Sequence, residues 1–339
     1  MSDHTTEPRM VRPVAVVGTG SYLPERVLTN AHLEEMIDTT DEWIVSRTGM
    51  KERHLARDDE AASDMASEAA KNALENANVK PEDVDLILVA TSTPDMIFPS
   101  TGCLTQAKIG ASNAVCMDIS AACSGFLYAM ELGKQYIATG GIETALIIGS
   151  EKMSSIVDWT DRGTCVLFGD AAGAVVLQAA KSGRGLMASE LGSDGTLGDL
   201  LKVPAGGSRQ PASQETVDGN LHTIQMSGRE VFKHAVTNMS AAATATLKRC
   251  GMTIEDVSCI VPHQANQRII QAIGQKVNAG PERFYVNVDK YGNTSAASVG
   301  VALDEVSRSG RLKPGDIVLI VAFGAGFTWG ASLIEWEKA

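Results

Sequence analysis

The chain has 339 residues, of which 44% are hydrophobic and 21% charged, with 41 acidic against 29 basic side chains. This length and composition are those of a globular protein with a sizeable core, built as one large domain or two ordinary ones. The net charge of −12 excludes a general affinity for nucleic acid or for anionic membranes, but says nothing about a local basic patch.

The first 13 residues are polar and mixed in charge, so they resemble neither a secretory leader nor a membrane anchor. The longest apolar run, 317–323, suits a buried strand and is too short to cross a bilayer. Neither a CxxC motif nor metal-ligand spacing connects the six cysteines, which are Cys103, Cys116, Cys123, Cys165, Cys250 and Cys259. We therefore expect reduced thiols, a cytoplasmic location and no metal site.

Apolar segments alternate with helical patterns along the whole chain. The expected strands are, in chain order, 14–18, 86–90, 116–119, 145–149, 173–177, 259–262, 284–288, 317–323 and 331–336. This alternation predicts an α/β fold with buried, largely parallel sheets. Residues 183–225 are rich in Gly, Ser and Pro, and are expected to form a connecting excursion of loops or hairpins.

An internal repeat relates residues 67–87 to the chain 173 positions later. The matching residues are Ser67, Ala69, Ala70, Leu74, Glu82, Asp83, Val84 and Ile87 against Ser240, Ala242, Ala243, Leu247, Glu255, Asp256, Val257 and Ile260. Each copy predicts a helix, a short turn and a buried strand. Two Ala-rich helices can match by chance, but the shared Glu-Asp-Val turn favours duplication. We therefore predict two duplicated αβ halves, residues 1–182 and 183–339.

Cys123 lies where an apolar strand gives way to small residues and then to a helical pattern, within 117–126. Unpaired N–H groups and the macrodipole stabilise a thiolate at a helix N-terminus. Most lone cysteines are buried and unreactive, which is our interpretation of the other five. The small neighbours of Cys123 leave room for a substrate, which favours a nucleophile there.

Two further polar residues lie, like Cys123, where an expected strand gives way to a helix. His263 follows the expected strand 259–262, and Asn293 follows Tyr291 and Gly292. A lone His is more often structural, and an Asn after Gly often serves as a turn or cap residue. Ligands of α/β sheets bind beyond the carboxyl ends of strands, so the two halves are expected to bring Cys123, His263 and Asn293 together. The glycine-rich loop 324–330 is either a tight turn or a source of oxyanion donors.

Six segments together match one known family: 41–49, 117–126, 161–164, 263–269, 292–298 and 324–330. From about Val14 to Trp336 the chain resembles the β-ketoacyl-acyl carrier protein synthase III family, the initiating condensing enzymes of type II fatty acid synthesis. The resemblance implies a thiolase-like fold, layered α-β-α-β-α. It also implies a homodimer without metal or prosthetic group.

By this resemblance Cys123 accepts the acyl group of an acyl-CoA, expected to be acetyl-CoA. Malonyl-acyl carrier protein then loses CO₂ and condenses with the acyl-enzyme to give a 3-oxoacyl-acyl carrier protein. His263 and Asn293 would donate hydrogen bonds to the malonyl thioester oxygen, where negative charge develops. Backbone N–H groups of Cys123 and Ala325 would hold the acyl oxygen. CoA is then part of a substrate and not a cofactor.

The resemblance also implies binding roles at the mouth of the site. Trp43 and Arg162 would sandwich the CoA adenine, with Arg47 and Thr39 nearby, and an indole and a guanidinium both stack well on a base. Asn266 would help to order the active site.

Two contacts with other chains are implied as well. Phe98 would reach across a dimer interface to line the acyl pocket of the partner subunit. Lys233, Arg268 and Lys276 would form a positive face for the acidic carrier protein, with Gln275 in place of a common basic residue.

Three alternatives remain open. The first is a related condensing enzyme of secondary metabolism, or one primed by branched or longer acyl groups, because pocket depth depends on packing among Phe98, Phe168 and Phe232. The second is a non-catalytic acyl-CoA-binding relative, which would not need the Cys, His and Asn. The third is a papain-like hydrolase, with His as general base oriented by Asn, which would need neither Trp43 nor Arg162.

Overall fold

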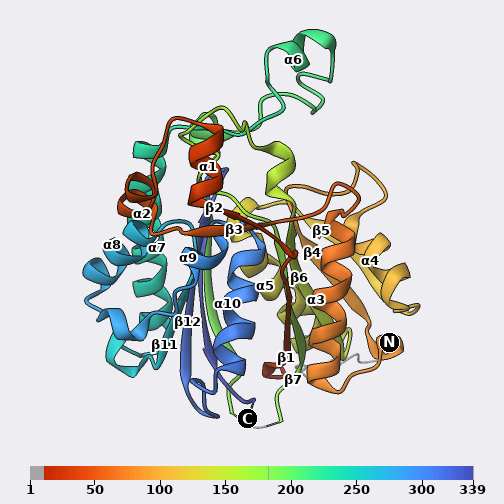
Figure 1. The fold of residues 1–339 in the computed structure, drawn as a ribbon. Coiled ribbons are helices and arrows are strands. Elements are labelled where there is room, and N and C mark those ends of the chain that lie inside the picture. The colour runs from red at the N-terminus through yellow and green to blue at the C-terminus, as the bar shows by residue number, and fades with distance from the viewer. Residues whose placement is uncertain (1–10, 182, 339) are drawn as a thin grey trace.

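Two β-sheets face each other at the centre of the molecule, with helices between them and on both outer faces (Figure 1). The structure is a computed structural model that describes residues 11–181 and 183–338. The first sheet has the order β1 (Val14–Tyr22), β7 (Ala171–Ala179), β6 (Thr144–Glu151), β4 (Leu86–Ala90), β5 (Val115–Ile119). The second has the order β11 (Cys259–Pro262), β12 (Ile317–Gly324), β13 (Thr328–Glu335), β8 (Leu186–Ser193).

Helices form three layers around these sheets. The middle layer holds α5 (Gly125–Ala138) and α10 (Ala297–Arg308), most of whose residues are buried because a sheet lies on either side. The outer faces carry α3 (Ala62–Ala77) and α4 (Thr101–Ile109) on the first sheet, and α7 (Gly228–Arg249) and α8 (Gln267–Val277) on the second. The predicted α-β-α-β-α layering is confirmed.

The internal repeat is visible in the fold. In the first copy, α3 leads through the short helix Pro81–Asp83 into β4. In the second, α7 leads through the short helix Ile254–Asp256 into β11. The second turn and strand each begin 173 residues after the first, which confirms the duplicated helix, turn and strand. The division into independent halves at residue 182 stays a prediction.

The expectation of largely parallel sheets is wrong. β4 pairs in parallel with β5 and β6, and β11 with β12, but β7 and β13 are each antiparallel to both neighbours. Only residues 325–327 join β12 to β13, and such a short connection permits only antiparallel pairing.

The expected strand 284–288 is also wrong. Only one bridge, from Ile260 to Phe284, joins this segment to β11. Pro262 lacks the N–H group that would continue the ladder to the Tyr285 carbonyl. The Nε2 of Gln264 donates to that carbonyl instead, at 3.1 Å, so a side chain replaces the strand pairing.

The segment 183–225 is more ordered than its composition predicts. Its first part forms β8, a full edge strand of the second sheet, where only loops or hairpins were expected. The remainder contains the short strands β9 (Leu201–Lys202) and β10 (Gln225–Met226) and the helix α6 (Gln214–Asp218). The part around α6 projects from the body of the molecule, as an excursion should (Figure 1).

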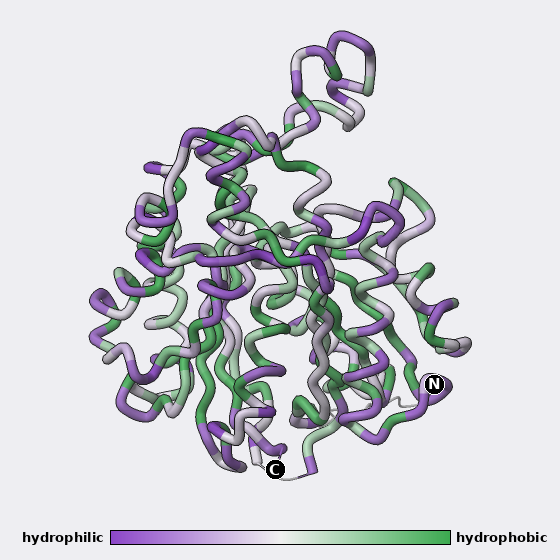
Figure 2. Tube along the Cα trace, in the orientation of Figure 1, coloured by the Kyte–Doolittle hydropathy of each residue, from purple (hydrophilic) through white to green (hydrophobic). Residues whose placement is uncertain are grey.

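A small cap covers one end of the layered core. It consists of the paired strands β2 (Arg26–Thr29) and β3 (Glu52–Leu55), with α1 (Asn30–Met36), α2 (Asp41–Thr48) and α9 (Val288–Tyr291) nearby. Figure 2 shows apolar segments in the central strands and polar ones on the outer surface. Among the described residues, no helix is both long and apolar enough to span a membrane. The prediction for residues 1–13 falls mostly outside the described chain.

Candidate active site

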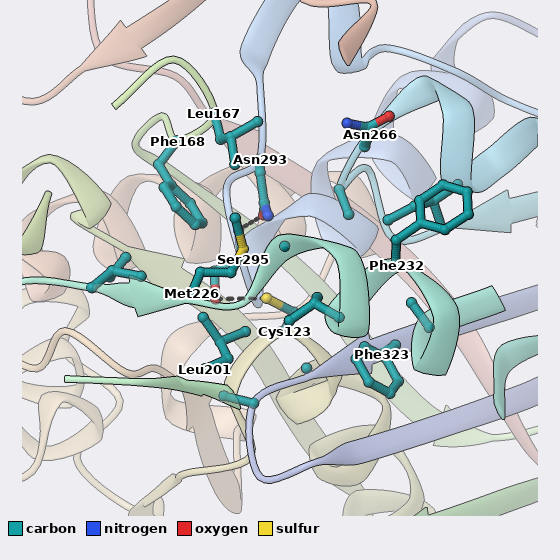
Figure 3. Close-up of a pocket in the computed structure, with 18 of the residues that line it drawn as sticks. Cys123, Leu167, Phe168, Leu201, Met226, Phe232, Asn266, Asn293, Ser295 and Phe323 are labelled. Carbon is teal, nitrogen blue, oxygen red and sulfur yellow. Dashed lines mark hydrogen bonds between the residues drawn. The ribbon is translucent and has the colours of Figure 1, made fainter. Parts of the chain in front are cut away.

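Cys123 lies in a short helical turn, Ala122–Ser124, directly before α5. The residue is 8% exposed, and its thiol lies 3.4 Å from the hydroxyl of Ser295 (Figure 3). The end of β12 approaches this turn so closely that a Cβ at Gly324 would lie 2.6 Å from the Cys123 nitrogen. Glycine at 324 therefore allows the backbones of β12 and of the Cys123 turn to meet at the thiol.

Burial sets the protonation state of this thiol. It raises the pKa of Cys123 to about 12, with a smaller contribution in the same direction from the nearby carboxylate of Glu151. The helix N-terminus alone favours a thiolate. In this structure the thiol is protonated at neutral pH, because the cavity wall removes it from water.

His263 follows β11 and is 2% exposed. Its Nδ1 lies 2.6 Å from the hydroxyl oxygen of Ser298, in the first turn of α10, and that oxygen accepts the N–H of Gln264 at 3.4 Å. We assign the hydroxyl proton of Ser298 to the bond with Nδ1, which leaves an N–H at Nε2. Burial lowers the pKa of His263 to about 3, so the imidazole is neutral.

Both backbone polar groups of Asn293 are hydrogen-bonded to the segment 167–169. Its N–H donates to the carbonyl of Leu167 at 2.8 Å, and its carbonyl accepts from Gly169 at 3.2 Å. The side-chain Oδ1 accepts the N–H of Ser295 at 2.9 Å, which leaves the amide Nδ2 free to donate (Figure 3). Both His263 and Asn293 are thus oriented as hydrogen-bond donors.

One cavity of about 730 Å³ joins these residues. Its lining residues come from segments far apart in the sequence, from Trp43 to Ala325. Of the residues expected at the site, its wall contains Trp43, Arg47, Cys123, His263, Asn266, Arg268, Asn293 and Ala325. The structure therefore brings Cys123, His263 and Asn293 together, while Thr39, Arg162, Phe98, Lys233 and Lys276 lie outside the wall.

The mouth of the cavity is formed at α2. The guanidinium groups of Arg47 and Arg162 lie over the Trp43 ring, 4.8 and 4.7 Å from its centroid. Arg162 also donates to the carbonyl of Asp38 at 2.8 Å. A base can stack between Trp43 and Arg162 only if the guanidinium moves away. Nearby, the hydroxyl of Thr39 is buried without a partner among the described residues.

Asn266 and Ala325 have different local roles. Asn266 caps α8 through the N–H of Arg268 at 2.8 Å and donates to the carbonyl of Arg47 at 3.1 Å, so it ties α8 to α2. Ala325 lies in the turn between β12 and β13. Among the described residues, the N–H of Ala325 makes no recorded backbone hydrogen bond.

The remaining expected residues lie on the surface. Phe98 is 82% exposed, in an apolar loop with Ile97. Lys233, Arg268 and Lys276 are exposed along the line where α7 meets α8. Arg268 lies over the Phe232 ring of α7, and Lys276 reaches Thr237 of α7 at 3.5 Å.

Three residues at the site were missed as functional residues: Glu151, Ser295 and Ser298. Ser295 and Ser298 belong to the segment 292–298 that carries the family resemblance, but nothing in their spacing showed which side chains they contact. Glu151 did carry a signal, because it is a charge at the carboxyl end of an apolar strand, where sites of α/β folds form. No group of three or more His, Cys, Asp or Glu side chains able to hold a metal occurs in the described chain.

Comparison with known proteins agrees with this geometry. Family models of 3-oxoacyl-[acyl-carrier-protein] synthase III match residues 117–195, and those of its C-terminal part match 247–336. A β-ketoacyl-[acyl-carrier-protein] synthase III of Caldanaerobacter subterraneus is 57% identical over 95% of this chain and 98% of the relative. Its counterpart from Clostridioides difficile is 51% identical over 95% and 98%.

Solved structures show the same fold. The 3-oxoacyl-[acyl-carrier-protein] synthase III of Aquifex aeolicus superposes with a TM-score of 0.89 at 46% identity, covering 95% of this chain and all of that one. The priming β-ketosynthase of the R1128 polyketide pathway superposes with 0.90 at 33% identity, over 98% and 99%. The chain therefore belongs to the β-ketoacyl-[acyl-carrier-protein] synthase III family of acyl-transferring condensing enzymes.

Proposed function

We propose that this chain starts fatty acid synthesis by condensing an acyl-CoA primer with malonyl-acyl carrier protein through an acyl group on Cys123. Cys123 attacks the thioester carbonyl of the primer and CoA leaves. Malonyl-acyl carrier protein then loses CO₂, and the resulting enolate attacks the acyl-Cys123 carbonyl to form a 3-oxoacyl-acyl carrier protein.

One observation carries this proposal: His263 and Asn293 each present a donor to the cavity that Cys123 lines. The Ser298 hydroxyl occupies Nδ1 of His263, and the Ser295 N–H occupies Oδ1 of Asn293. Two fixed donors stabilise the negative charge that develops on the malonyl thioester oxygen when CO₂ leaves. A neutral imidazole suits this role, because donation and not proton abstraction is required.

The acyl oxygen on Cys123 needs its own stabilisation. The nitrogen of Cys123 lies beside Gly324 at the end of β12, and Ala325 follows directly in the chain, with no recorded backbone acceptor for its N–H among the described residues. We infer that these two N–H groups form the oxyanion hole for attack on the acyl group. The two half-reactions would then use separate donor pairs.

Substrate recognition is proposed at the mouth. Trp43, Arg47 and Arg162 would hold the CoA adenine by stacking, after Arg162 leaves its present contact with the indole. The hydroxyl of Thr39, which is buried without a partner among the described residues, would supply a polar contact to the nucleotide once binding exposes it. We propose acetyl-CoA as the primer.

Two protein contacts complete the proposal. The exposed cations on α7 and α8 would bind the acidic carrier protein, since their charge opposes that of the carrier. The exposed apolar loop with Ile97 and Phe98 would be covered in a homodimer. We also propose that the enzyme is cytoplasmic and needs neither a metal nor a prosthetic group.

Of the alternatives, a role in secondary metabolism is the nearest. The polyketide-priming relative is 33% identical, whereas the fatty acid relatives above reach 57%, which supports the fatty acid role. A hydrolase that uses His263 as base would need a free lone pair at Nε2, which the bond from Ser298 opposes.

The test is intact-protein mass spectrometry of the wild type and Cys123→Ala after incubation with acetyl, branched and long-chain acyl-CoAs. We expect an acetyl adduct on the wild type only, discharged to a 3-oxoacyl product by malonyl-acyl carrier protein. If an adduct forms only with longer or branched acyl-CoAs, one of these and not acetyl-CoA is the primer. The absence of an adduct with every acyl-CoA would overturn the proposed mechanism.

A further inference from the structure

Glu151, the last residue of β6, is a fully buried carboxylate beside the reactive thiol. Its Oε2 accepts hydrogen bonds from the hydroxyl of Thr93 at 2.7 Å and the N–H of Ser92 at 3.0 Å. Its Oε1 accepts the hydroxyl of Ser295 at 2.8 Å. Among the described residues, Glu151 has no ion-pair partner. Burying a charge without a cation costs free energy, so we infer that Glu151 has a role other than packing.

Ser295 connects this carboxylate to the thiol. Its hydroxyl oxygen lies 3.4 Å from the Sγ of Cys123 (Figure 3). The same hydroxyl donates to Oε1 of Glu151. The three groups form one continuous donor chain, from the thiol to the hydroxyl to the carboxylate. Nothing else in the described chain offers the thiol proton an acceptor through a recorded hydrogen bond.

The backbone is in an unusual conformation at two residues next to the thiol. Of the described residues other than glycine, five have positive φ, and three of these are Asn, which tolerates the left-handed region. The other two are Ala122, at φ +46°, and Ser295, at φ +48°, one on each side of the thiol. Such strain gathers at functional sites, where the surrounding structure maintains it.

The reaction requires a proton acceptor at this place. A thioester is attacked by the thiolate, so the proton of Cys123 must leave. His263 is poorly suited to take it, because Nδ1 is bonded to Ser298 and burial lowers the imidazole pKa to about 3. Burial raises the pKa of Glu151, which makes that carboxylate the better base. Transfer from thiol to carboxylate also leaves the net charge of the buried site unchanged.

We propose that Ser295 and Glu151 form a proton relay for the acylation of Cys123, an inference that rests on the proposed function. As the Sγ–carbon bond forms, the thiol proton passes to Ser295 Oγ, and the hydroxyl proton of Ser295 passes to Glu151 Oε1. As the carbon–sulfur bond to CoA breaks, the proton returns through Ser295 to the departing sulfur. Acyl-CoA and thiol thus become acyl-Cys123 and CoA thiol, and Glu151 is ionised again.

Two substitutions remove the relay with little change of shape. Glu151→Gln is isosteric, and Ser295→Gly deletes the hydroxyl while favouring the left-handed backbone at this position. Ser150→Ala is the matched control, because it removes a neighbouring buried hydroxyl that bonds only to the carbonyl of Ala62. The rate of acylation by acetyl-CoA alone is measured by rapid quench and intact mass. The variants are then acylated to completion and chased with malonyl-acyl carrier protein.

We expect acylation to slow by about 100-fold or more in both relay variants, the range of general acid–base catalysis, with discharge by malonyl-acyl carrier protein unchanged. The Ser150→Ala control should acylate as the wild type does. Wild-type acylation rates in Glu151→Gln or Ser295→Gly would overturn the relay. Equal slowing of both half-reactions would also overturn it, since that result marks a structural role. A wild type that forms no acyl adduct would instead contradict the proposed function.

Discussion

The floor of the cavity, formed by Cys123, His263 and Asn293, and its mouth at α2 differ in how firmly their side chains are held. On the floor, Cys123, His263 and Asn293 are at most 8% exposed, and the side-chain atoms of His263 and Asn293 that point away from the cavity are held by neighbours. At the mouth, Arg47 and Arg162 are exposed and lie over Trp43, and Arg162 is held by a hydrogen bond to the carbonyl of Asp38. A fixed floor suits the stabilisation of developing charge, and an adjustable mouth suits the entry of a large nucleotide.

This difference predicts different kinetic effects for substitutions in the two regions. A floor donor acts on the transition state, so its loss lowers kcat. A mouth residue binds a part of the substrate that does not react, so its loss raises KM and leaves kcat nearly unchanged.

The largest effect is expected for Asn293→Asp. The aspartate keeps an oxygen to accept the Ser295 N–H, but it presents an acceptor to the cavity in place of a donor. We expect kcat for condensation to fall by about 10²–10³, the cost of one oxyanion donor. Steady-state assays with acyl-CoA and malonyl-acyl carrier protein measure this, with the amount of acyl adduct as the control for an intact Cys123. A kcat close to that of the wild type would refute the donor role.

A smaller effect is expected for Trp43→Ala. Loss of a stacking partner should raise KM for acyl-CoA by on the order of ten- to a hundredfold, because stacking on an aromatic side chain contributes about 1–3 kcal/mol. The control substrate is a short acyl thioester without the nucleotide, whose KM should not change. If both substrates are affected equally, Trp43 supports the fold of α2 and does not bind the adenine.

A still smaller effect is expected for Lys276→Gln on the surface. We expect KM for the carrier protein to rise several-fold at low salt and the difference to disappear at high salt, since exposed charges are screened. Lys248→Gln, at the far end of α7, is the control for the change in net charge. An effect that persists at high salt would show that the contact is not electrostatic.

The smallest effect concerns pH. Because the pKa of His263 is lowered to about 3, discharge of the acyl-enzyme should show no inflection near 6.5, the ordinary value for His. Below about pH 6.5 the imidazole of the unfolded chain takes up a proton, whereas that of the folded chain stays neutral until about pH 3. The free energy of unfolding is therefore highest above pH 6.5 and decreases as the pH falls. Denaturant unfolding should therefore show a smaller loss of stability between pH 7.5 and 5 for His263→Gln than for the wild type. An inflection near 6.5 would contradict a neutral donor.

The sequence predicts the α/β class and the junctions well, for a physical reason, whereas the layering was implied by the family resemblance. Buried strands are continuous apolar runs, and the helix-turn-strand repeat carries its pattern at a constant spacing, so both are local signals. The failures involve long-range partners. The segment 284–288 has the apolar pattern of a strand, but Pro262, the last residue of β11, and Gln264, two residues beyond it, prevent its pairing.

The distinction between local signals and long-range contacts also applies to the site. Cys123, His263 and Asn293 were predicted from their positions at element boundaries and from the family resemblance. The bonds that orient them join residues far apart in sequence, such as Ser298 to His263 and Glu151 to Ser295. Arg162 over the Trp43 ring is another contact that no spacing in the sequence reveals.

The most direct test of the fixed floor separates the two half-reactions in His263→Ala. The variant is acylated with acetyl-CoA, and the adduct is followed by intact mass before and after addition of malonyl-acyl carrier protein. We expect a full acyl adduct on Cys123 that persists after the chase, because the donor for decarboxylation is missing. Failure to form the adduct, or its normal discharge, would contradict separate donors for the two steps.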